Sequence, residues 1–484
     1  MGAQLGQTRV RRTLFGRMLA PLALALALAG CAGVTTPTEV VTTAPVRAAP
    51  SGQHAQIIQA YGGVYSDPEL ERTLARIVGR LVAASDDPSR SYTITVLNAA
   101  AVNAFALPDG KLYVTRGLLA LANDSSEVAA VLAHEMAHVT ANHAALRQEQ
   151  VVTAQIVGEV VRDVIEDEAA GQTALVTSQQ TLAGFSRQQE LEADAIGIRT
   201  VARAGYDPYA ASRFLSAMSR FAAYRAASGV RHNERPEFLS SHPNNPERID
   251  AAVVAARQIG APGVGEVDRE RYLAGLDGVV FGDDTRQGYV RGRSFYHADL
   301  AIAFTVPQGW AIENTQEAVL ATGPDGTALR FDSVELDIGQ TLPDYLLSGW
   351  INGLDRASVQ STAINGLPAA TASAAAQGWS FRITLVQVGA QTYRFIFAND
   401  SGSSGLAQAA AAISGSFRQL SAQEAAGLRP LTIDIVMVVA GDTPQSLAQR
   451  MQGVENPLAL FLILNGLNEG ATLQPGTTVK IVTD

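Results

Sequence analysis

The segment 127–149 contains neither proline nor glycine, and its apolar residues recur at the spacing of a buried helical face. Inside it lies the pentapeptide His-Glu-Met-Ala-His at positions 134–138. Histidines four positions apart project from the same side of a helix, so His134 and His138 can reach one metal ion, with Glu135 beside them. The segment therefore predicts a long buried helix that carries a hydrolytic zinc site.

A capping signal at the start of this segment supports the helix. Asp124 is a favourable N-cap, and Glu127 three residues later is the reciprocal partner in a capping box. The alternative is a surface helix with two incidental histidines. Burying two imidazoles and a carboxylate without a partner would cost desolvation energy, which favours the metal site.

A second acidic pair offers the third protein ligand that a catalytic zinc ion requires. Glu190 and Asp194 are also four residues apart and share one face of a predicted helix. Glu190 is suited to bind the metal, and Asp194 to accept a hydrogen bond from a ligating histidine. The alternative interpretation of this pair is a solvated acidic face.

These two motifs and the segment 103–119 together resemble the gluzincin peptidases, the family typified by CAAX prenyl protease 1, the heat-shock protease HtpX and the periplasmic protease BepA. The resemblance covers roughly residues 55–255, and its three motifs occur in the family's order. In soluble members, the segment similar to 103–119 forms a hairpin beside the active-site cleft. Such an exposed edge can bind an extended peptide by strand addition.

The resemblance implies a role for each site residue. Glu135 would be the general base, which takes a proton from a zinc-activated water and returns it to the leaving amine. Asp194 would orient a ligating imidazole. The zinc ligands would be His134, His138 and Glu190, with one ion per chain, although other divalent ions can occupy such sites.

Three further residues accompany these motifs. His143 lies about half a turn off the ligand face, so we interpret it as a supporting or structural residue rather than a ligand. The stretch 240–249 resembles the family's His-Pro loop, in which His242 would gate the metal or stabilise the transition state and Arg248 would anchor the loop or an oxyanion. The alternative for both is a capped helix start, because Asn-Pro at 245–246 is typical of an N-cap followed by proline.

The sequence therefore predicts a zinc metalloendopeptidase, and the resemblance to BepA implies a role in quality control of misfolded or stalled envelope proteins. The alternative is a catalytically latent chaperone or scaffold that binds outer-membrane proteins or peptidoglycan. The intact set of His134, Glu135, His138 and Glu190 favours the enzyme, because a scaffold has no need of it.

The N-terminus predicts where this chemistry takes place. An arginine-rich start precedes an apolar run at 18–29, and Leu-Ala-Gly-Cys at 28–31 resembles a bacterial lipobox, so residues 1–31 are expected to be a lipoprotein signal peptide. Cys31 is the single cysteine of the chain and the expected lipidation site; the alternative is a plain signal peptide. Ala32 favours anchoring at the outer membrane, facing the periplasm, over the inner membrane.

Charge and hydropathy argue against a nucleic-acid-binding protein and against a multi-span membrane protease. Loss of the signal peptide with its four arginines would lower the formal net charge from −10 to −14, which argues against a nucleic-acid partner. No other apolar run reaches the length of a membrane span, which argues against the multi-span branches of the family. Residues 32–54 are rich in threonine, proline and alanine and are expected to be a flexible linker.

The length predicts a multidomain chain, since roughly 450 mature residues exceed what one core usually serves. Residues 55–275 should form a mainly α-helical zincin peptidase domain with a small sheet at 105–115, and residues 276–295 a linker. The helices expected in the peptidase domain are 67–84, 125–148, 151–166, 187–203 and 208–220.

Residues 296–420 alternate in the manner of strands and predict an α+β accessory domain. A four-residue stretch at 307–310 weakly resembles PsbP-like domains. His297 stands alone, which is more typical of a surface residue than of a metal ligand, so we interpret the domain as an interaction or positioning module. Strands are expected at 301–306, 329–334, 379–386 and 392–397, a turn at 388–391, and helices at 341–353 and 403–415.

Residues 430–484 resemble a LysM domain, with a strand, two helices and a strand in order. LysM domains bind glycans that contain N-acetylglucosamine, such as peptidoglycan, so the resemblance implies a glycan partner. Val438 and Val439 depart from the family, because an aromatic or polar residue is frequent there. The alternative is therefore a degenerate LysM-like fold that only packs on its neighbours.

Overall fold

The structure, a computed structural model, describes residues 52–147, 185–227, 238–243, 246–315, 317–400 and 405–484. The described residues from 52 onward belong to one packing unit, within which several parts can be distinguished. The predicted signal peptide with Cys31, nearly all of the expected linker 32–54 and the predicted helix 151–166 lie outside the described residues. Within the described ranges, no helix is both long and apolar enough to cross a membrane.

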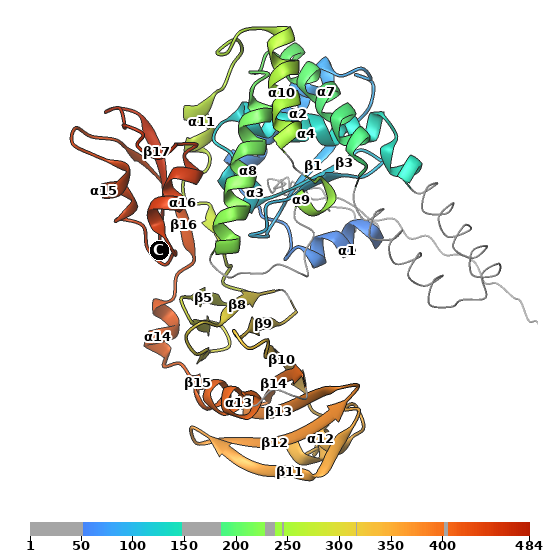
Figure 1. Ribbon diagram of the computed structural model, residues 1–484, viewed down its shortest axis with the longest axis vertical. Helices are drawn as coiled ribbons and strands as arrows, with labels where there is room; N and C mark the ends of the chain where they lie inside the picture. The colour runs from blue at the N-terminus through green and yellow to red at the C-terminus, as the bar shows by residue number, and fades with distance from the viewer. Residues whose placement is uncertain (1–51, 148–184, 228–237, 244–245, 316, 401–404) are drawn as a thin grey trace, which may run out of the picture. The chain divides into compact units, whose positions relative to one another are not determined.

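The chain is multidomain: a mainly helical part with a small sheet is followed by a large antiparallel sheet and a small α+β unit (Figure 1). The described helices of the first part are α1 (Gly52–Ala60), α2 (Pro68–Ala84), α3 (Arg116–Leu121), α4 (Ser125–Thr140), α7 (Arg187–Arg203), α8 (Ala210–Ala227), α9 (Phe238–Ser241), α10 (Pro246–Ile259) and α11 (Arg269–Ala274).

A three-stranded sheet lies beside these helices in the order β1-β3-β2. The predicted hairpin is confirmed, because β2 (Ala104–Ala106) pairs antiparallel with β3 (Lys111–Thr115). β1 (Thr93–Leu97) pairs parallel with β3, a contact that the hairpin pattern does not predict. β2 therefore lies at the edge of the sheet.

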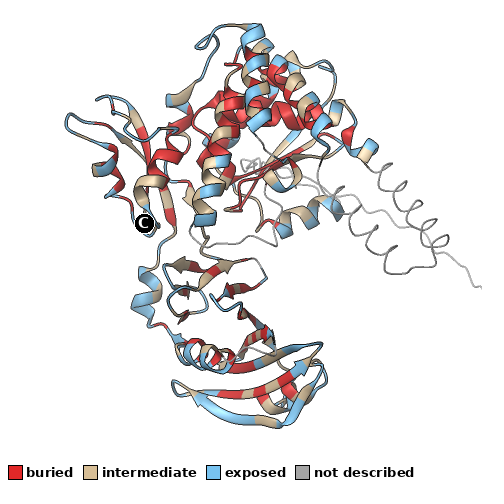
Figure 2. Cartoon of the chain, viewed as in Figure 1, coloured by how far each residue is buried: buried red, intermediate tan, exposed pale blue. Residues whose placement is uncertain are grey.

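Helix α4 begins where its capping signal predicts and is buried over most of its length (Figure 2). The Asp124 carboxylate accepts a hydrogen bond from the Glu127 backbone N–H at 2.8 Å. The Glu127 carboxylate accepts from the backbone N–H of Asn123 at 2.9 Å, one residue before the N-cap. The single helix predicted to residue 148 is interrupted: α4 ends at Thr140 because Asn142 is left-handed, with φ at 56°, and residues 143–147 are helical again.

Helix α7 packs closely along α4, and its predicted bounds of 187–203 are confirmed. A capping box between Ser186 and Gln189 fixes its start. Gly197 permits the close approach, since a Cβ atom there would lie 3.1 Å from the backbone nitrogen of His134. Helix α2 also agrees with its prediction to within one residue, whereas α8 starts two residues later and ends seven residues later than predicted.

The large sheet contains seven antiparallel strands in the order β11-β12-β13-β14-β10-β9-β8. The predicted strands at 329–334, 379–386 and 392–397 and the turn at 388–391 are confirmed. The bounds are β8 (Ala311–Asn314), β9 (Val319–Thr322), β10 (Ala328–Glu335), β11 (Leu354–Ile364), β12 (Leu367–Ala376), β13 (Trp379–Val388) and β14 (Gln391–Asp400), with helices α12 (Leu342–Leu347) and α13 (Leu406–Gly415).

Two predictions for this sheet were wrong in extent. The prediction omitted β8, β9, β11 and β12, and the alanine-rich sequence of β12 is typical of a helix by intrinsic preference. The helix expected at 341–353 ends at Leu347, shortly before Gly349, which has φ at 99°. Residues 403–404 of the other expected helix lie outside the described part of the chain.

The segment expected to be a linker, 276–295, contains strands instead. β5 (Tyr289–Arg291) and the start of β6 (Ser294–His297) form a second sheet with β7 (Ile302–Thr305) and β15 (Arg418–Gln419). β4 (Val280–Phe281) pairs with the first strand of the C-terminal unit. His297 is half-buried, and its Nδ1 accepts a hydrogen bond from the Leu300 backbone N–H at 3.3 Å.

The C-terminal unit follows the predicted order of strand, helix, helix and strand. Its elements are β16 (Leu431–Met437), α15 (Pro444–Ala448), α16 (Pro457–Leu464) and β17 (Thr478–Thr483), followed by one last residue, and the sheet order is β17-β16-β4. α14 (Ala422–Gly427) precedes it. The buried apolar residues of this unit belong to the same cluster as those of α2, α4 and α8, so one core serves both parts.

Candidate metal centre

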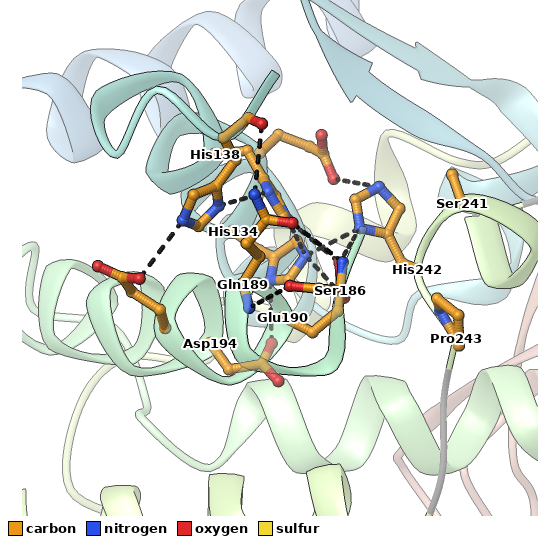
Figure 3. A network of polar contacts seen from close by, with 12 residues as sticks. His134, His138, Ser186, Gln189, Glu190, Asp194, Ser241, His242 and Pro243 are labelled. Carbon is orange, nitrogen blue, oxygen red and sulfur yellow. Dashed lines mark hydrogen bonds and ion pairs between the residues drawn. The ribbon is translucent and has the colours of Figure 1, made fainter. Parts of the chain in front are cut away.

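Four buried side chains from three elements converge on one point (Figure 3). His134 and His138 project from α4, Glu190 from the first turn of α7, and His242 from the residue after α9. Their candidate ligand atoms all lie within 4.8 Å of one another. The structure thus brings together the three predicted ligands and His242.

The spacing of these atoms fits a tetrahedral zinc ion. With ligands at about 2.0–2.1 Å, neighbouring ligand atoms in a tetrahedral site lie about 3.3–3.4 Å apart. The Nε2 atoms of His134 and His138 are 3.0 Å apart, and each lies 3.5 Å from a Glu190 oxygen. His242 Nδ1 lies 3.2 Å from His134 Nε2 and 3.0 Å from Glu190 Oε1. The donor set and its geometry therefore suit this metal.

Asp194 holds the outer nitrogen of His134. The Nδ1 atom of His134 lies 2.9 Å from Asp194 Oδ1, which leaves Nε2 facing the ligand cluster. Burial alone would raise the pKa of Asp194, but the His134 ring and the Arg248 guanidinium outweigh it and lower that pKa. Asp194 is therefore an ionised acceptor, as the spacing of four from Glu190 suggested.

His143 occupies the corresponding place behind His138. Its Nδ1 atom is 2.9 Å from His138 Nδ1, on the side of the ring away from Glu190. Burial lowers the pKa of His138 to about 3, so its imidazole is neutral and offers a lone pair to a metal. Phe185 stacks on His138, with ring centroids 3.9 Å apart. His143 thus contacts a candidate ligand without being one.

Glu135 lies next to the cluster and is fully buried. Its Oε1 atom is 3.5 Å from His242 Nε2. Burial raises the pKa of its carboxyl, although the His242 and His134 rings oppose this. A hydrogen bond from the backbone of Ala106 ties Glu135 to the edge strand β2. A carboxylate in this position can exchange a proton with a water molecule held beside the cluster.

Arg248 joins the two carboxylates to the loop that carries His242. Its Nε and Nη2 donate to the two oxygens of Asp194 at 2.8 and 2.9 Å, and its Nη1 lies 2.6 Å from Glu190 Oε2. The same Nη1 donates to the Pro243 carbonyl at 3.1 Å. Arg248 therefore connects the loop at Pro243 to the carboxylates of Asp194 and Glu190. The expected cap Asn245 lies outside the described residues.

Sequence reasoning missed three residues of the site. Phe238 stacks on His242 with ring centroids 4.4 Å apart, Phe185 stacks on His138, and Glu192 approaches His143 at 3.5 Å. Glu192 follows the Glu190 ligand by two residues, so helical spacing alone suggests that it faces elsewhere. No periodic pattern in the sequence marks the two aromatic residues.

Comparison with known proteins agrees with this geometry. A sequence profile of Peptidase family M48 matches residues 68–255, which contain the whole cluster. Residues 68–255 form an M48 domain. Domains of this family use zinc, and the cluster of His134, His138, Glu190 and His242 is positioned to bind a metal ion.

Part of the chain is similar to curated proteins. The chain is 30% identical over 202 residues to the beta-barrel assembly-enhancing protease of Yersinia pestis, covering 40% of each chain. It is 29% identical over 218 residues to the Escherichia coli K12 protein of the same name, covering 43% of each. It is 32% identical over 178 residues to the mitochondrial metalloendopeptidase OMA1 of Schizosaccharomyces pombe, covering 36% of this chain and 50% of that one.

The matched part spans about two fifths to one half of the length of these relatives. Among solved structures, the solution structure of a PsbP protein from Synechocystis sp. PCC 6803 covers 28% of this chain and 98% of its own, at 13% identity and a TM-score of 0.22.

Replacing Asp194 with asparagine should weaken metal binding at this centre. The amide would no longer accept a charge-assisted bond from His134 and would leave Arg248 without its bidentate partner. We expect zinc affinity to fall by roughly 10- to 100-fold, measured by competition with a chromophoric chelator. Asp250→Asn, at an exposed position on α10, is the control and should leave the affinity unchanged. Equal affinity in both variants would contradict the orienting role of Asp194.

Proposed function

We propose that this chain is a zinc metalloendopeptidase of the bacterial envelope that hydrolyses peptide bonds in misfolded or stalled envelope proteins. The observation that carries the proposal is the convergence of His134, His138 and Glu190 around one point with the buried carboxylate of Glu135 beside them. The names of the Yersinia and Escherichia relatives supply the envelope setting.

In this proposal His134, His138 and Glu190 hold the ion, and zinc supplies the Lewis acidity that activates water near neutral pH. Glu135 takes the proton of the attacking water and returns it to the leaving amine. Asp194 keeps His134 in the tautomer that presents Nε2, and His143 restricts the rotation of His138. Arg248 keeps Asp194 and Glu190 in register with the loop that carries His242.

The edge strand β2 supports a polypeptide as the substrate. β2 pairs with β3 on one side only, so its other side offers backbone groups to an extended peptide. The Ala106 backbone at its end contacts Glu135, so a peptide added to this edge would pass the general base. This arrangement favours cleavage within a chain, because strand addition does not require a free terminus.

His242 in this proposal caps the metal until a substrate displaces it. A catalytic zinc ion keeps one of its four positions open, whereas a closed set of four protein ligands is typical of a structural site. His242 Nδ1 lies 3.0 to 3.2 Å from neighbouring ligand atoms, which is slightly below the separation of about 3.3–3.4 Å between ligands in a tetrahedral site and close enough for a fourth ligand. The enzyme would therefore be latent at rest.

We also propose that the protein is anchored at the periplasmic side of the outer membrane through a lipid on Cys31. The support is the lipobox pattern at 28–31 and the residue that follows it. The C-terminal unit adds a second attachment in this proposal, to peptidoglycan, supported by its strand-helix-helix-strand order.

Removing the cap should raise activity. His242→Ala opens the fourth position, so we expect cleavage of unfolded casein to rise by about tenfold, measured by release of a quenched fluorophore. The control is His297→Ala, since this half-buried histidine lies outside the M48 domain. A fall in activity in His242→Ala would contradict the cap and favour a role in stabilising the transition state.

Removing the general base should abolish hydrolysis while the metal stays bound. We expect Glu135→Gln to reduce the rate by at least about 100-fold, because the amide cannot accept the proton of water. Both the wild type and the His242→Ala background should be assayed, so that latency does not hide the effect. Glu71→Gln, at an exposed position on α2, is the matched control. Full activity of Glu135→Gln at normal zinc content, or no effect of a chelator, would contradict the proposed enzyme.

One fractionation tests both attachments. The full chain should sediment with outer membranes, and Cys31→Ser should leave that fraction because it lacks the lipid. If the C-terminal unit binds glycan, the Cys31→Ser protein will then sediment with purified sacculi and be released by lysozyme. A soluble Cys31→Ser protein would contradict glycan binding, and a Cys31→Ser protein still in the membrane would contradict the lipid anchor.

A further inference from the structure

A lysine from the C-terminal unit is buried against the segment that connects helices α3 and α4 of the M48 domain. Lys480, on β17, has no exposed surface. Its Nζ donates to the carbonyls of Ala120, Leu121 and Ala122 at 2.8, 3.2 and 2.7 Å. These carbonyls end α3, where the helix leaves its acceptors without partners. Lys480 thus caps the C-terminus of α3 from 358 residues away.

The chemistry of this contact requires lysine. An ammonium group has three hydrogens that diverge from one point, and here three carbonyls converge on it. The planar guanidinium of arginine does not offer this arrangement. Of the 36 lysines and arginines of the chain, only Lys111 and Lys480 are lysines. Burial and the nearby Arg269 lower the pKa of Lys480, whereas the carbonyl dipoles of the helix end favour its charged form.

The end of α3 that Lys480 contacts is directly followed by α4, the helix that carries His134 and His138. Ala122 is the C-cap of α3, and Asp124, two residues later, is the N-cap of α4. Arg269, also outside the matched M48 residues, donates to the Asn123 carbonyl at 2.8 Å. The two residues that directly follow α3, Ala122 and Asn123, are therefore fixed by groups from beyond the M48 match.

The C-terminal unit holds Lys480 itself firmly. The Asn465 side chain accepts from the Lys480 backbone N–H at 2.7 Å and donates to the Lys480 carbonyl at 2.9 Å. β16 pairs with β4, and the Gly278 backbone donates to the Ile433 carbonyl at 2.8 Å. The unit is thus bound to the peptidase part by strand pairing, a shared apolar core and a buried ammonium.

We infer that the C-terminal unit is an internal support of the peptidase site and that Lys480 is its positioning residue, which sets the register of α4 and hence of His134 and His138. The inference rests on the proposed function for the reaction concerned. His134 lies nine residues into α4, about 14 Å along the axis at 1.5 Å per residue. A helix transmits a shift at its start to its ligands, and a misplacement of about 1 Å can cost a reaction about 100-fold.

The test uses the full chain in the His242→Ala background. Lys480→Met keeps the length of the side chain and removes its three donors. Val482→Ala, on the same strand and equally buried, is the control that weakens the C-terminal core but keeps the ammonium. We expect both variants to lower Tm. Only Lys480→Met should lower kcat, by about tenfold with KM within twofold, and change the visible absorption spectrum of the cobalt-substituted protein.

Three results would contradict the supporting role of Lys480. Unchanged kcat and cobalt spectrum in Lys480→Met would overturn the inference. So would a loss of kcat in Val482→Ala that follows its Tm, because the effect would then be one of stability alone. If Lys480→Met does not fold, Asn465→Ala, which frees the Lys480 backbone, should show the same changes at smaller size, and their absence overturns the inference.

The same measurements distinguish a failure of the proposed peptidase function from a failure of the inference about Lys480. A parent protein that binds cobalt but cleaves no peptide contradicts the peptidase, and the cobalt spectra of the variants then decide the role of Lys480. A parent protein that binds no cobalt overturns both.

Discussion

The packing of α4 against α7 is the contact on which the rest of the site depends. Both helices present functional residues four positions apart, so each contributes one side of the ligand cluster. Gly197 lets the two backbones approach to the distance at which Glu190 meets His134 and Asp194 reaches the back of the same ring. Arg248 on α10 and the aromatic rings around the cluster then exclude water and fix the side chains.

Local spacing explains why so much of the site could be predicted. His134, His138, Glu190 and Asp194 lie on two regular helices, and helical geometry alone assigns each pair to one face. The start of α4 could also be predicted, because an N-cap hydrogen bond joins residues only three positions apart in the sequence. His242, which lies outside regular structure after α9, and Arg248, near the start of α10, followed only from resemblance to a family. Phe185, Phe238 and Glu192 followed from neither.

The errors share a physical cause, which is tertiary context. The end of α4 depends on one left-handed residue, Asn142, inside a run of helix-forming residues. Alanine-rich β12 is a strand because β11 and β13 pair with both its sides. The expected linker contains β4, whose partner lies 150 residues further along the chain. Lys480 is the extreme case, since nothing near it in sequence indicates that it caps a helix of another unit.

Charge balance connects the buried site to the metal. Glu135, Glu190 and Asp194 carry three negative charges when ionised, and the histidine interactions that lower the pKa values of Glu190 and Asp194 keep those two carboxylates charged. Arg248 returns one positive charge, which leaves a formal charge of −2 when the imidazoles of His134, His138 and His242 are neutral, the form in which histidine binds a metal. Uncompensated charge in a buried site is costly, and a divalent cation has the charge that neutralises it. Burial, with a smaller contribution from Glu190, raises the pKa of Glu135, which suits a group that both accepts a proton and returns it.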